Sequence, residues 1–183
     1  QSLAQASGII VPTNTVKNDI LATFPGVLPE RIFPIPEAPD EIFRHPSSII
    51  HHPSTIPDKY VLFVGNAYPH KNLTVLLEAM KQLQDYHLVI VAKPSPFLSR
   101  VLAPFDQTRL HVYSDLTDSE LVSVYKDAAM LVTPSLMEGY GLVGLEALMV
   151  GTPVVASNIA VYREVYGQQV TYFDPHSVSS LVS

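Results

Sequence analysis

Short apolar runs rich in β-branched residues alternate with longer amphipathic stretches through most of the chain. The runs are apolar at consecutive positions, a pattern typical of parallel strands that are buried on both faces of a sheet. Such strands are predicted at 60–64, 87–92, 110–113, 130–133, 153–156 and 170–173. The stretches between them carry apolar residues at helical spacing and predict helices at 73–83, 97–103, 118–129, 141–150 and 160–167.

This alternation predicts an α/β domain with a doubly wound, Rossmann-like parallel sheet. In this fold class, ligands bind in a crevice at the carboxyl ends of the strands. Two glycine-bearing turns, at 65–72 and 134–141, follow predicted strands and therefore fall at that edge. A nucleotide site requires this placement.

The beginning of the chain contains a further unit of the same kind. A buried strand is predicted at 9–11, and Thr13 or Asn14 is placed to cap a helix that runs to about Phe24. A short strand is predicted within 31–36. We interpret this piece as the last βα unit of a preceding domain.

A proline-rich stretch separates the two parts of the chain. Half of the 16 prolines fall between Pro25 and Pro57, a density that argues against a helix or a central strand there. We therefore predict three segments. Residues 1–44 are the end of an N-terminal domain with its crossover, 45–59 a linker, and 60–183 a C-terminal Rossmann-like domain truncated at its end.

Composition narrows the class of protein. A hydrophobic content of 47% and a net charge of −6 indicate a well-packed globular chain and argue against nucleic acid as a partner. Cysteine is absent and no apolar run could span a bilayer, which fits a cytoplasmic protein. The chain begins with Gln1 and stops at Ser183 in a predicted helix, so we expect a fragment of a longer protein whose other parts could contact a membrane peripherally.

The pair His51-His52 has no carboxylate at ligand spacing and is interpreted as a solvated loop rather than a metal site.

The most informative motif begins at Glu138 and ends at Glu146. Glu146 is the only charged residue between Gly139 and Tyr162. An unpaired carboxylate in such an apolar run would cost roughly several kcal/mol, so it needs a ligand hydroxyl or a distant Lys or Arg as its partner. Gly139 and Gly141 let the backbone approach a ligand and turn into a helix. A sugar–phosphate compound suits this combination.

The turn that begins at Gly65 offers a second candidate site. Its spacing to Lys71 approaches the P-loop pattern, but His70 replaces the second glycine and Asn72 the magnesium-binding hydroxyl, which argues against a P-loop NTPase. A helix N-terminus with Lys71 and His70 beside it suits a diphosphate held without an obligatory metal. The alternative, a surface lysine and a plain turn, stays open at this point.

Together the two motifs resemble the C-terminal, donor-binding domain of retaining family 4 glycosyltransferases, which have the GT-B fold of two facing Rossmann-like domains. The specific match is EGYGLVGLEAL at 138–148. Supporting similarity lies at 64–72, 119–135, 151–157, Glu164-Val165 and 172–175, and the resemblance extends over nearly the whole chain.

The resemblance assigns roles to individual residues. Lys71 would contact the donor diphosphate, Glu138 the hydroxyls of the transferred sugar, and Glu146 the nucleotide ribose. Lys71 and Glu138 are therefore the expected catalytic residues. Asn66 stands where many members carry Arg, and the 92–94 turn would lie near the base pocket. The full set of expected donor-binding residues is Gly65, Asn66, His70, Lys71, Glu138, Gly139, Tyr140, Gly141, Leu142 and Glu146.

The implied activity is transfer of a hexose from a nucleoside-diphosphate sugar to an acceptor hydroxyl, with retention of configuration and no cofactor or obligatory metal. A saccharide or lipid-linked acceptor would bind through the missing N-terminal domain, so the fragment should bind donor with little turnover. Polysaccharide or lipopolysaccharide assembly is the setting that this analogy favours. The alternative is a non-catalytic nucleotide-sugar-binding or regulatory module.

Two further alternatives are weaker. A glycosidase pair would place its carboxylates across an open cleft, whereas Glu138 precedes a helix and Glu146 lies within it. In a purely structural reading, Glu146 pairs with a core arginine. Tyr125 is predicted to pack in the core, and His87 and His111 to lie at the edge away from the ligand.

Overall fold

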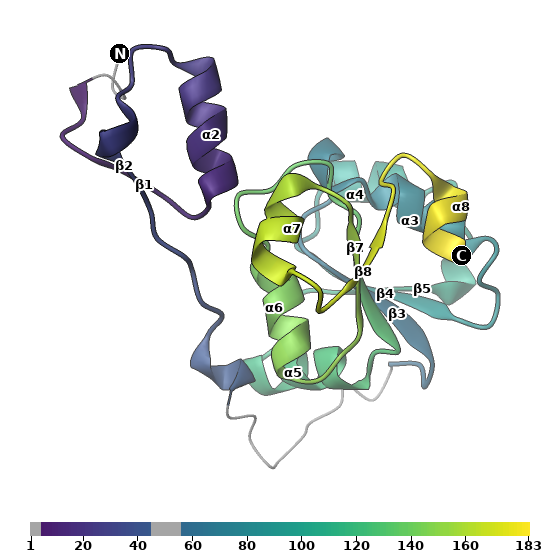
Figure 1. Ribbon diagram of the computed structural model, residues 1–183. Helices are drawn as coiled ribbons and strands as arrows, with labels where there is room; N and C mark the ends of the chain where they lie inside the picture. Colours follow the sequence, from purple (N-terminus) through teal and green to yellow (C-terminus); the bar gives the residue numbers. More distant parts are fainter. Residues whose placement is uncertain (1–4, 45–55) are drawn as a thin grey trace.

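The computed structural model describes residues 5–44 and 56–183 and contains a six-stranded, fully parallel sheet (Figure 1). The strand order is β5-β4-β3-β6-β7-β8. The strands are β3 (Tyr60–Val64), β4 (His87–Val91), β5 (Leu110–Tyr113), β6 (Met130–Thr133), β7 (Val154–Ser157) and β8 (Thr171–Phe173). The helices are α3 (Leu73–Met80), α4 (Pro96–Leu102), α5 (Asp118–Asp127), α6 (Leu142–Met149), α7 (Ala160–Tyr166) and α8 (Val178–Val182).

The predicted fold class, a doubly wound Rossmann-like sheet, is confirmed, and each predicted strand and helix of this region is present within a few residues. The helix predicted at 73–83 ends earlier, at Met80. The reason is a long-range contact, because the guanidinium of Arg109 donates hydrogen bonds to the carbonyls of Met80, Leu83 and Tyr86 as the chain turns. Because Arg109 lies far from this helix in the sequence, the local pattern of residues 73–83 does not show where the helix ends.

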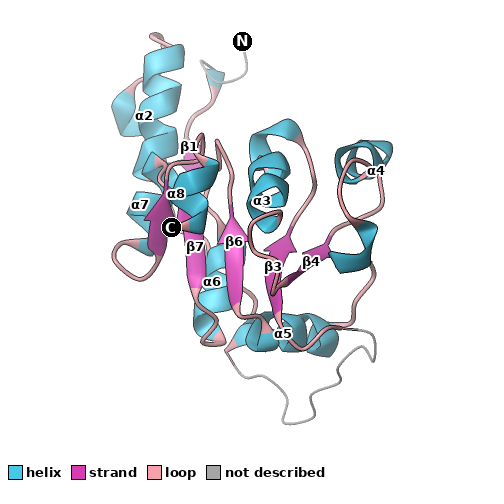
Figure 2. Ribbon diagram, turned by 90° about the vertical axis from the view of Figure 1, so that its right-hand side faces the viewer, coloured by secondary structure: helices cyan, strands magenta, loops and turns pink. Residues whose placement is uncertain are grey.

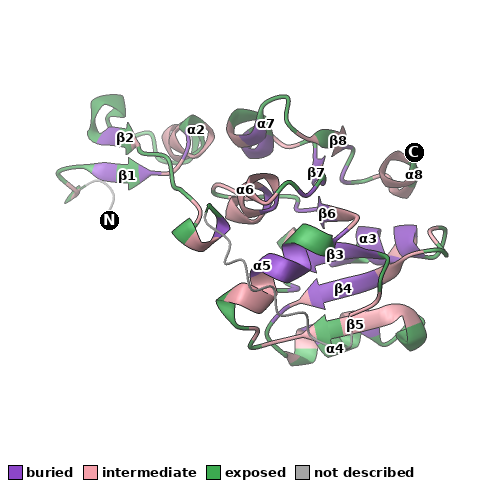
Figure 3. Cartoon of the chain, turned by 90° about the horizontal axis from the view of Figure 1, so that it is seen from below, coloured by how far each residue is buried: buried purple, intermediate pink, exposed green. Residues whose placement is uncertain are grey.

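Both faces of the sheet are covered, as the consecutive apolar runs require (Figures 2 and 3). Leu62 and Val89 face a core that includes residues of α5, α6 and α7. Val61 and Phe63, the sequence neighbours of Leu62, face the opposite core with residues of α3 and α4. Successive side chains of a strand point to opposite faces, so each strand contributes to both cores.

The first part of the chain forms a separate two-stranded parallel sheet, whose strands are β1 (Ile9–Val11) and β2 (Ile32–Pro34). Helix α2 (Asn14–Thr23) packs on it, and its N-cap is Thr13, whose hydroxyl accepts a hydrogen bond from the Val16 amide. Short 3₁₀ turns occupy Pro29–Arg31, Glu41–Phe43, Pro69–Lys71 and Gln107–Arg109.

The predicted division at residues 44 and 59 stays a prediction. Most of the predicted linker, with His51-His52, lies outside the described residues. In the part of the chain that is described, no helix has the length and apolar character needed to cross a bilayer.

The N-terminal unit contacts the six-stranded unit through the start of α2, which lies beside α7 (Figure 1). The carboxylate of Glu164 on α7 accepts hydrogen bonds from the backbone amides of Asn14 and Thr15 at 2.7 and 2.8 Å and from both of their side chains. The Thr13 hydroxyl donates to the Gly139 carbonyl at 3.3 Å. The N-terminal unit therefore lies directly against the turn that carries the predicted site.

Candidate functional site

The strand order reverses between β3 and β6, and the loops that follow these strands form what we call the carboxyl edge, residues 65–72 and 134–141. A reversal of this kind opens the crevice in which doubly wound folds bind ligands. The two loops are joined where the Leu136 amide donates to the His70 carbonyl at 2.7 Å. The prediction that both glycine-bearing turns meet at one edge is therefore confirmed.

Lys71 and Glu138 form an ion pair across this crevice. The lysine Nζ lies 2.5 Å from Oε1 of Glu138, and the side chains are only 19% and 13% exposed. The Ser135 hydroxyl and the Tyr162 hydroxyl donate to the same oxygen at 2.8 and 3.2 Å. Among the described residues, none donates to Oε2 of Glu138. One carboxylate oxygen is thus fixed, while the other keeps its capacity to accept a hydrogen bond.

Glu146, on α6, has a tyrosine rather than a cation as its partner. The hydroxyl of the fully buried Tyr125 donates to Oε2 of Glu146 at 2.5 Å. Burial raises the pKa of Glu146, the Tyr125 hydrogen bond opposes that rise, and the Asp40 charge adds to it. No arginine or lysine of the described residues forms an ion pair with Glu146, which removes the core-arginine alternative for that part of the chain.

The sequence analysis placed Tyr125 in the core, which is confirmed, but missed its contact with Glu146. A signal was available, because a buried tyrosine hydroxyl needs a hydrogen-bond acceptor and Glu146 is the only charge in its apolar run. Burial and the neighbouring Glu146 charge raise the pKa of Tyr125, so it stays a donor at neutral pH.

The glycine turn leads into α6 through Gly141. This residue has φ +101, and a Cβ there would lie 2.7 Å from Cε1 of Tyr162 and overlap the Tyr166 hydroxyl. The Tyr166 hydroxyl instead donates to the Gly141 carbonyl at 2.6 Å. Of the two glycines in this turn, only Gly141 is in the left-handed region, so the predicted sharp turn depends on it and not on Gly139.

The loop after β3 reaches α3 through a 3₁₀ turn that contains His70 and Lys71. Gly65 has φ +134, and Asn72 takes the left-handed conformation immediately before α3. The side chains of Asn66 and His70 are exposed. Because the first amides of an α-helix have no partner within the helix, the starts of α3 and α6 direct N–H groups toward the carboxyl edge.

A cavity of about 450 Å³ opens beside this loop, at the carboxyl ends of β3, β4 and β5. The predicted site residues Gly65 and Asn66 line it, and so do Lys93 and Asp115. It includes two residues of the 92–94 turn, Ala92 and Lys93, which the resemblance places near a nucleotide base. The cavity is large enough to hold part of a small ligand beside the loop that carries Lys71.

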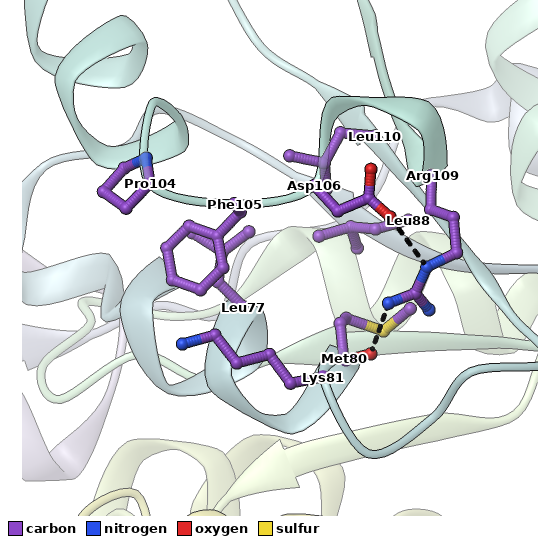
Figure 4. Close-up of a pocket in the computed structure, with 9 residues that line it drawn as sticks. All are labelled: Leu77, Met80, Lys81, Leu88, Pro104, Phe105, Asp106, Arg109 and Leu110. Atoms are coloured by element: carbon purple, nitrogen blue, oxygen red, sulfur yellow. Dashed lines mark hydrogen bonds and ion pairs between the residues drawn. The ribbon is translucent and has the colours of Figure 1, made fainter.

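A smaller cavity of about 230 Å³ lies at the opposite edge of the sheet (Figure 4). It is lined by Leu77, Met80, Lys81, Leu88, Pro104, Phe105, Asp106, Arg109 and Leu110. Its charged groups are engaged with their neighbours: Arg109 with three carbonyls and Asp106, and Lys81 with Glu78 and the ring of Phe105. This cavity therefore presents mainly apolar surface to a ligand, and its charged side chains have partners within the chain.

His87 and His111 lie near the starts of β4 and β5, on the same side of the sheet as the smaller cavity, as predicted. Their rings share a hydrogen bond of 2.9 Å between Nδ1 and Nε2. Burial and the neighbouring His87 lower the pKa of His111. Within residues 5–44 and 56–183, no three His, Asp or Glu side chains gather as metal ligands would.

The structure therefore brings most predicted site residues to one edge and joins Lys71 to Glu138. Glu146 lies about one helical turn into α6, and His70 contributes its backbone carbonyl to the joined loops. Tyr140 is only partly buried, and burial and the charge of Glu37 in the N-terminal unit raise the pKa of its hydroxyl. Ser135, Tyr162 and Tyr166 were not predicted as parts of the site.

Fold and site together define a Rossmann-like domain with a charged crevice at its switch point. The chain matches the family "Glycosyl transferases group 1" over residues 48–183, and it belongs to that family. It is 33% identical over 138 residues to the serotype-specific mannosyltransferase WbdA of Escherichia coli, an alignment that covers 69% of this chain and 17% of WbdA.

Solved glycosyltransferases share the fold. A glycosyltransferase from Rickettsia africae superposes with a TM-score of 0.78 at 17% identity, covering 96% of this chain and 51% of that chain. Alr3699/HepE of Anabaena, solved in complex with UDP and glucose, gives a TM-score of 0.77 at 17% identity, covering 97% and 52%. The chain thus spans about half the length of these structures and has the GT-B type of Rossmann-like fold.

Proposed function

We propose that this chain binds the donor of a retaining hexosyltransferase, which moves a hexose from a nucleoside-diphosphate sugar to an acceptor hydroxyl. The observation that carries the proposal is the Lys71–Glu138 pair at the strand switch point, together with a cavity of about 450 Å³ that Gly65 and Asn66 of the Lys71 loop line. The family of the chain supports sugar transfer as the chemistry.

In the proposed site, Lys71 and the starts of α3 and α6 stabilise the charge that develops on the leaving diphosphate. A phosphate beside Lys71 would share a lysine whose charge Glu138 balances in the ligand-free chain. The free Oε2 of Glu138 then accepts a hydroxyl of the transferred sugar. Glu146 accepts a ribose hydroxyl, and Tyr125 keeps its carboxylate in place. We propose that no metal is obligatory, because these groups supply the positive potential themselves.

Retention would follow if the acceptor attacks from the face that the diphosphate leaves. The acceptor, a saccharide or a lipid-linked sugar, would be held by parts of the protein outside this chain, in the cytoplasm and near a membrane surface. The printed name of WbdA, a mannosyltransferase, makes mannose the first sugar to test. Polysaccharide assembly is the corresponding process.

Calorimetric titration of the chain with GDP, UDP and ADP, with and without Mg²⁺, tests the proposal. We expect metal-independent binding of one nucleotide, weakened about 10- to 100-fold in Lys71→Ala, since hydrogen bonds to charged groups contribute about 1.5–3 kcal/mol. Lys81→Ala is the matched control, because Lys81 lines the cavity at the opposite edge. Equal nucleotide affinities of the Lys71→Ala and Lys81→Ala variants would contradict the proposed location of the donor site. Transfer by the longer protein would separate an enzyme from a binding module.

A further inference from the structure

Tyr162 is a completely buried residue of α7 whose hydroxyl reaches the candidate site. It lies 3.2 Å from Oε1 of Glu138 and 2.5 Å from Oγ1 of Thr133 on β6. Because the side chain has no exposure, it has no surface with which to touch a ligand itself. Its hydroxyl can instead act on the donor through Glu138, the site residue with which it forms a hydrogen bond.

The direction of these hydrogen bonds follows from the number of protons. A tyrosine hydroxyl has one proton, so when Tyr162 donates to Glu138, the Thr133 hydroxyl must donate to Tyr162. The two bonds form a chain from the end of β6 to the carboxylate, and successive bonds in such a chain polarise each other. Burial and the Glu138 charge raise the pKa of Tyr162, so the donor persists at neutral pH.

The same helix also holds the far end of the glycine turn. Tyr166 stacks on Tyr162 with 4.9 Å between ring centroids, and its hydroxyl donates to the Gly141 carbonyl. One face of α7 thus contacts Glu138 and Gly141, the two ends of the four-residue segment that precedes α6. The rigid stack fixes the distance between these two contacts.

We propose that Tyr162 is a positioning residue of the donor site, which orients Glu138 so that Oε2 faces the hydroxyls of the transferred sugar. The inference rests on the proposed function and deepens it. Lys71 and Ser135 restrain Glu138 from one loop each, and Tyr162 adds a restraint from a packed helix. Loss of the Tyr162 hydroxyl should therefore affect recognition of the sugar and spare recognition of the nucleotide.

Calorimetric titration of wild type and Tyr162→Phe with GDP, GDP-mannose, UDP and UDP-glucose tests this. We expect the affinity for the nucleotide sugar to fall about three- to tenfold in the variant, the effect of one hydrogen bond, while the affinity for the nucleoside diphosphate stays the same. Tyr60→Phe is the matched control. Its equally buried hydroxyl, at the start of β3, donates to the Val124 carbonyl at 2.8 Å and not to Glu138, and its removal should change neither affinity.

Two results would overturn the inference. One is a parallel loss of both affinities in Tyr162→Phe, which a general structural defect would cause, and the other is no loss of either. A double-mutant cycle adds a third test, because in a Glu138→Gln background Tyr162→Phe should have no further effect on sugar affinity. If the wild-type chain binds no nucleotide, that result contradicts the proposed function itself. It is distinguishable from the two results above, in which the wild-type chain binds and only the effect of the variant differs from the expectation.

Discussion

The two edges of the six-stranded sheet both carry a cavity and charged side chains, but these side chains have different partners. At what we call the amino edge, the cavity near the starts of β4 and β5, Arg109 bonds three backbone carbonyls and contacts Asp106. At the carboxyl edge, Glu138 uses one oxygen for three donors and keeps the other free, and the starts of two helices face the crevice.

The difference separates charges that stabilise the fold from charges that can bind a ligand. Arg109 satisfies the carbonyls that the end of α3 leaves open, so its hydrogen-bonding capacity is used within the chain. Glu138 and Glu146 are each bonded at one oxygen among the described residues, and the second oxygen can accept a hydroxyl. Cavity size and apolar lining alone do not show this difference in hydrogen-bonding capacity.

The largest effect is expected at the glycine turn of the carboxyl edge. Gly141→Ala should lower the free energy of unfolding by about 3 kcal/mol, because it combines left-handed strain with overpacking against Tyr162 and Tyr166. Gly151→Ala is the control, since Gly151 also has positive φ but nothing lies within 4 Å of its added Cβ, and we expect a loss of about 1 kcal/mol. Urea unfolding measures the free energy of unfolding of both variants. Equal losses would contradict the overpacking, because they would mean that Tyr162 and Tyr166 can move aside for the added methyl group.

A somewhat smaller effect is expected at the amino edge. Arg109→Met should lower the unfolding free energy by about 2 kcal/mol, because three partly buried carbonyls lose their donor while the apolar stem is kept. Nucleotide affinity should not change, since the site lies at the other edge. A loss of affinity in folded Arg109→Met, measured by calorimetry, would break the separation of the two edges.

Glu146 provides a test in which stability and binding move in opposite directions. Burial raises its pKa, so the folded carboxyl holds its proton more tightly than the unfolded one. The residue therefore costs stability as the pH rises above about 4.3, its unfolded value, and through the folded pKa. Relative to wild type, Glu146→Gln should become more stable between about pH 4 and pH 7 while nucleotide affinity falls. A stability difference that does not vary with pH would contradict this account.

The smallest effect is expected where the N-terminal unit meets α7. Burial opposes ionisation of Glu164, but hydrogen bonds from Thr15 and Asn14 outweigh it and lower the pKa. This stabilisation is present above the unfolded pKa and is lost as the pH falls through the folded one. Glu164→Gln should speed hydrogen exchange of the Asn14 and Thr15 amides up to about fivefold at neutral pH, because the site is exposed. Unchanged exchange would show that the contact contributes little.

The sequence predicted the fold more completely than the site, for physical reasons. Short apolar runs that contain β-branched residues, at 60–64 and 130–133, predict buried strands, and the structure has strands with these bounds. The topology then placed Gly65 and Glu138 at one edge. Contacts such as Lys71 with Glu138, 67 residues apart, depend on side-chain reach, and no local pattern encodes them.

Tyrosines were the main omission. Tyr125, Tyr162 and Tyr166 look like core residues because their rings are buried, and only the position of each hydroxyl shows that it supports the site. That position depends on how α5 and α7 are rotated against α6. Apolar periodicity sets such a rotation to within a side chain's width, which is too coarse to identify one hydrogen bond.

The most direct test of the difference between the two edges is to map backbone amide chemical shifts by NMR while the nucleoside diphosphate that binds is added to the isotopically labelled chain. The account predicts the largest shifts at 65–72 and 139–146, with the amides of 105–110 unchanged. Shifts centred on 105–110 would contradict it and would place the ligand in the apolar cavity beside Arg109.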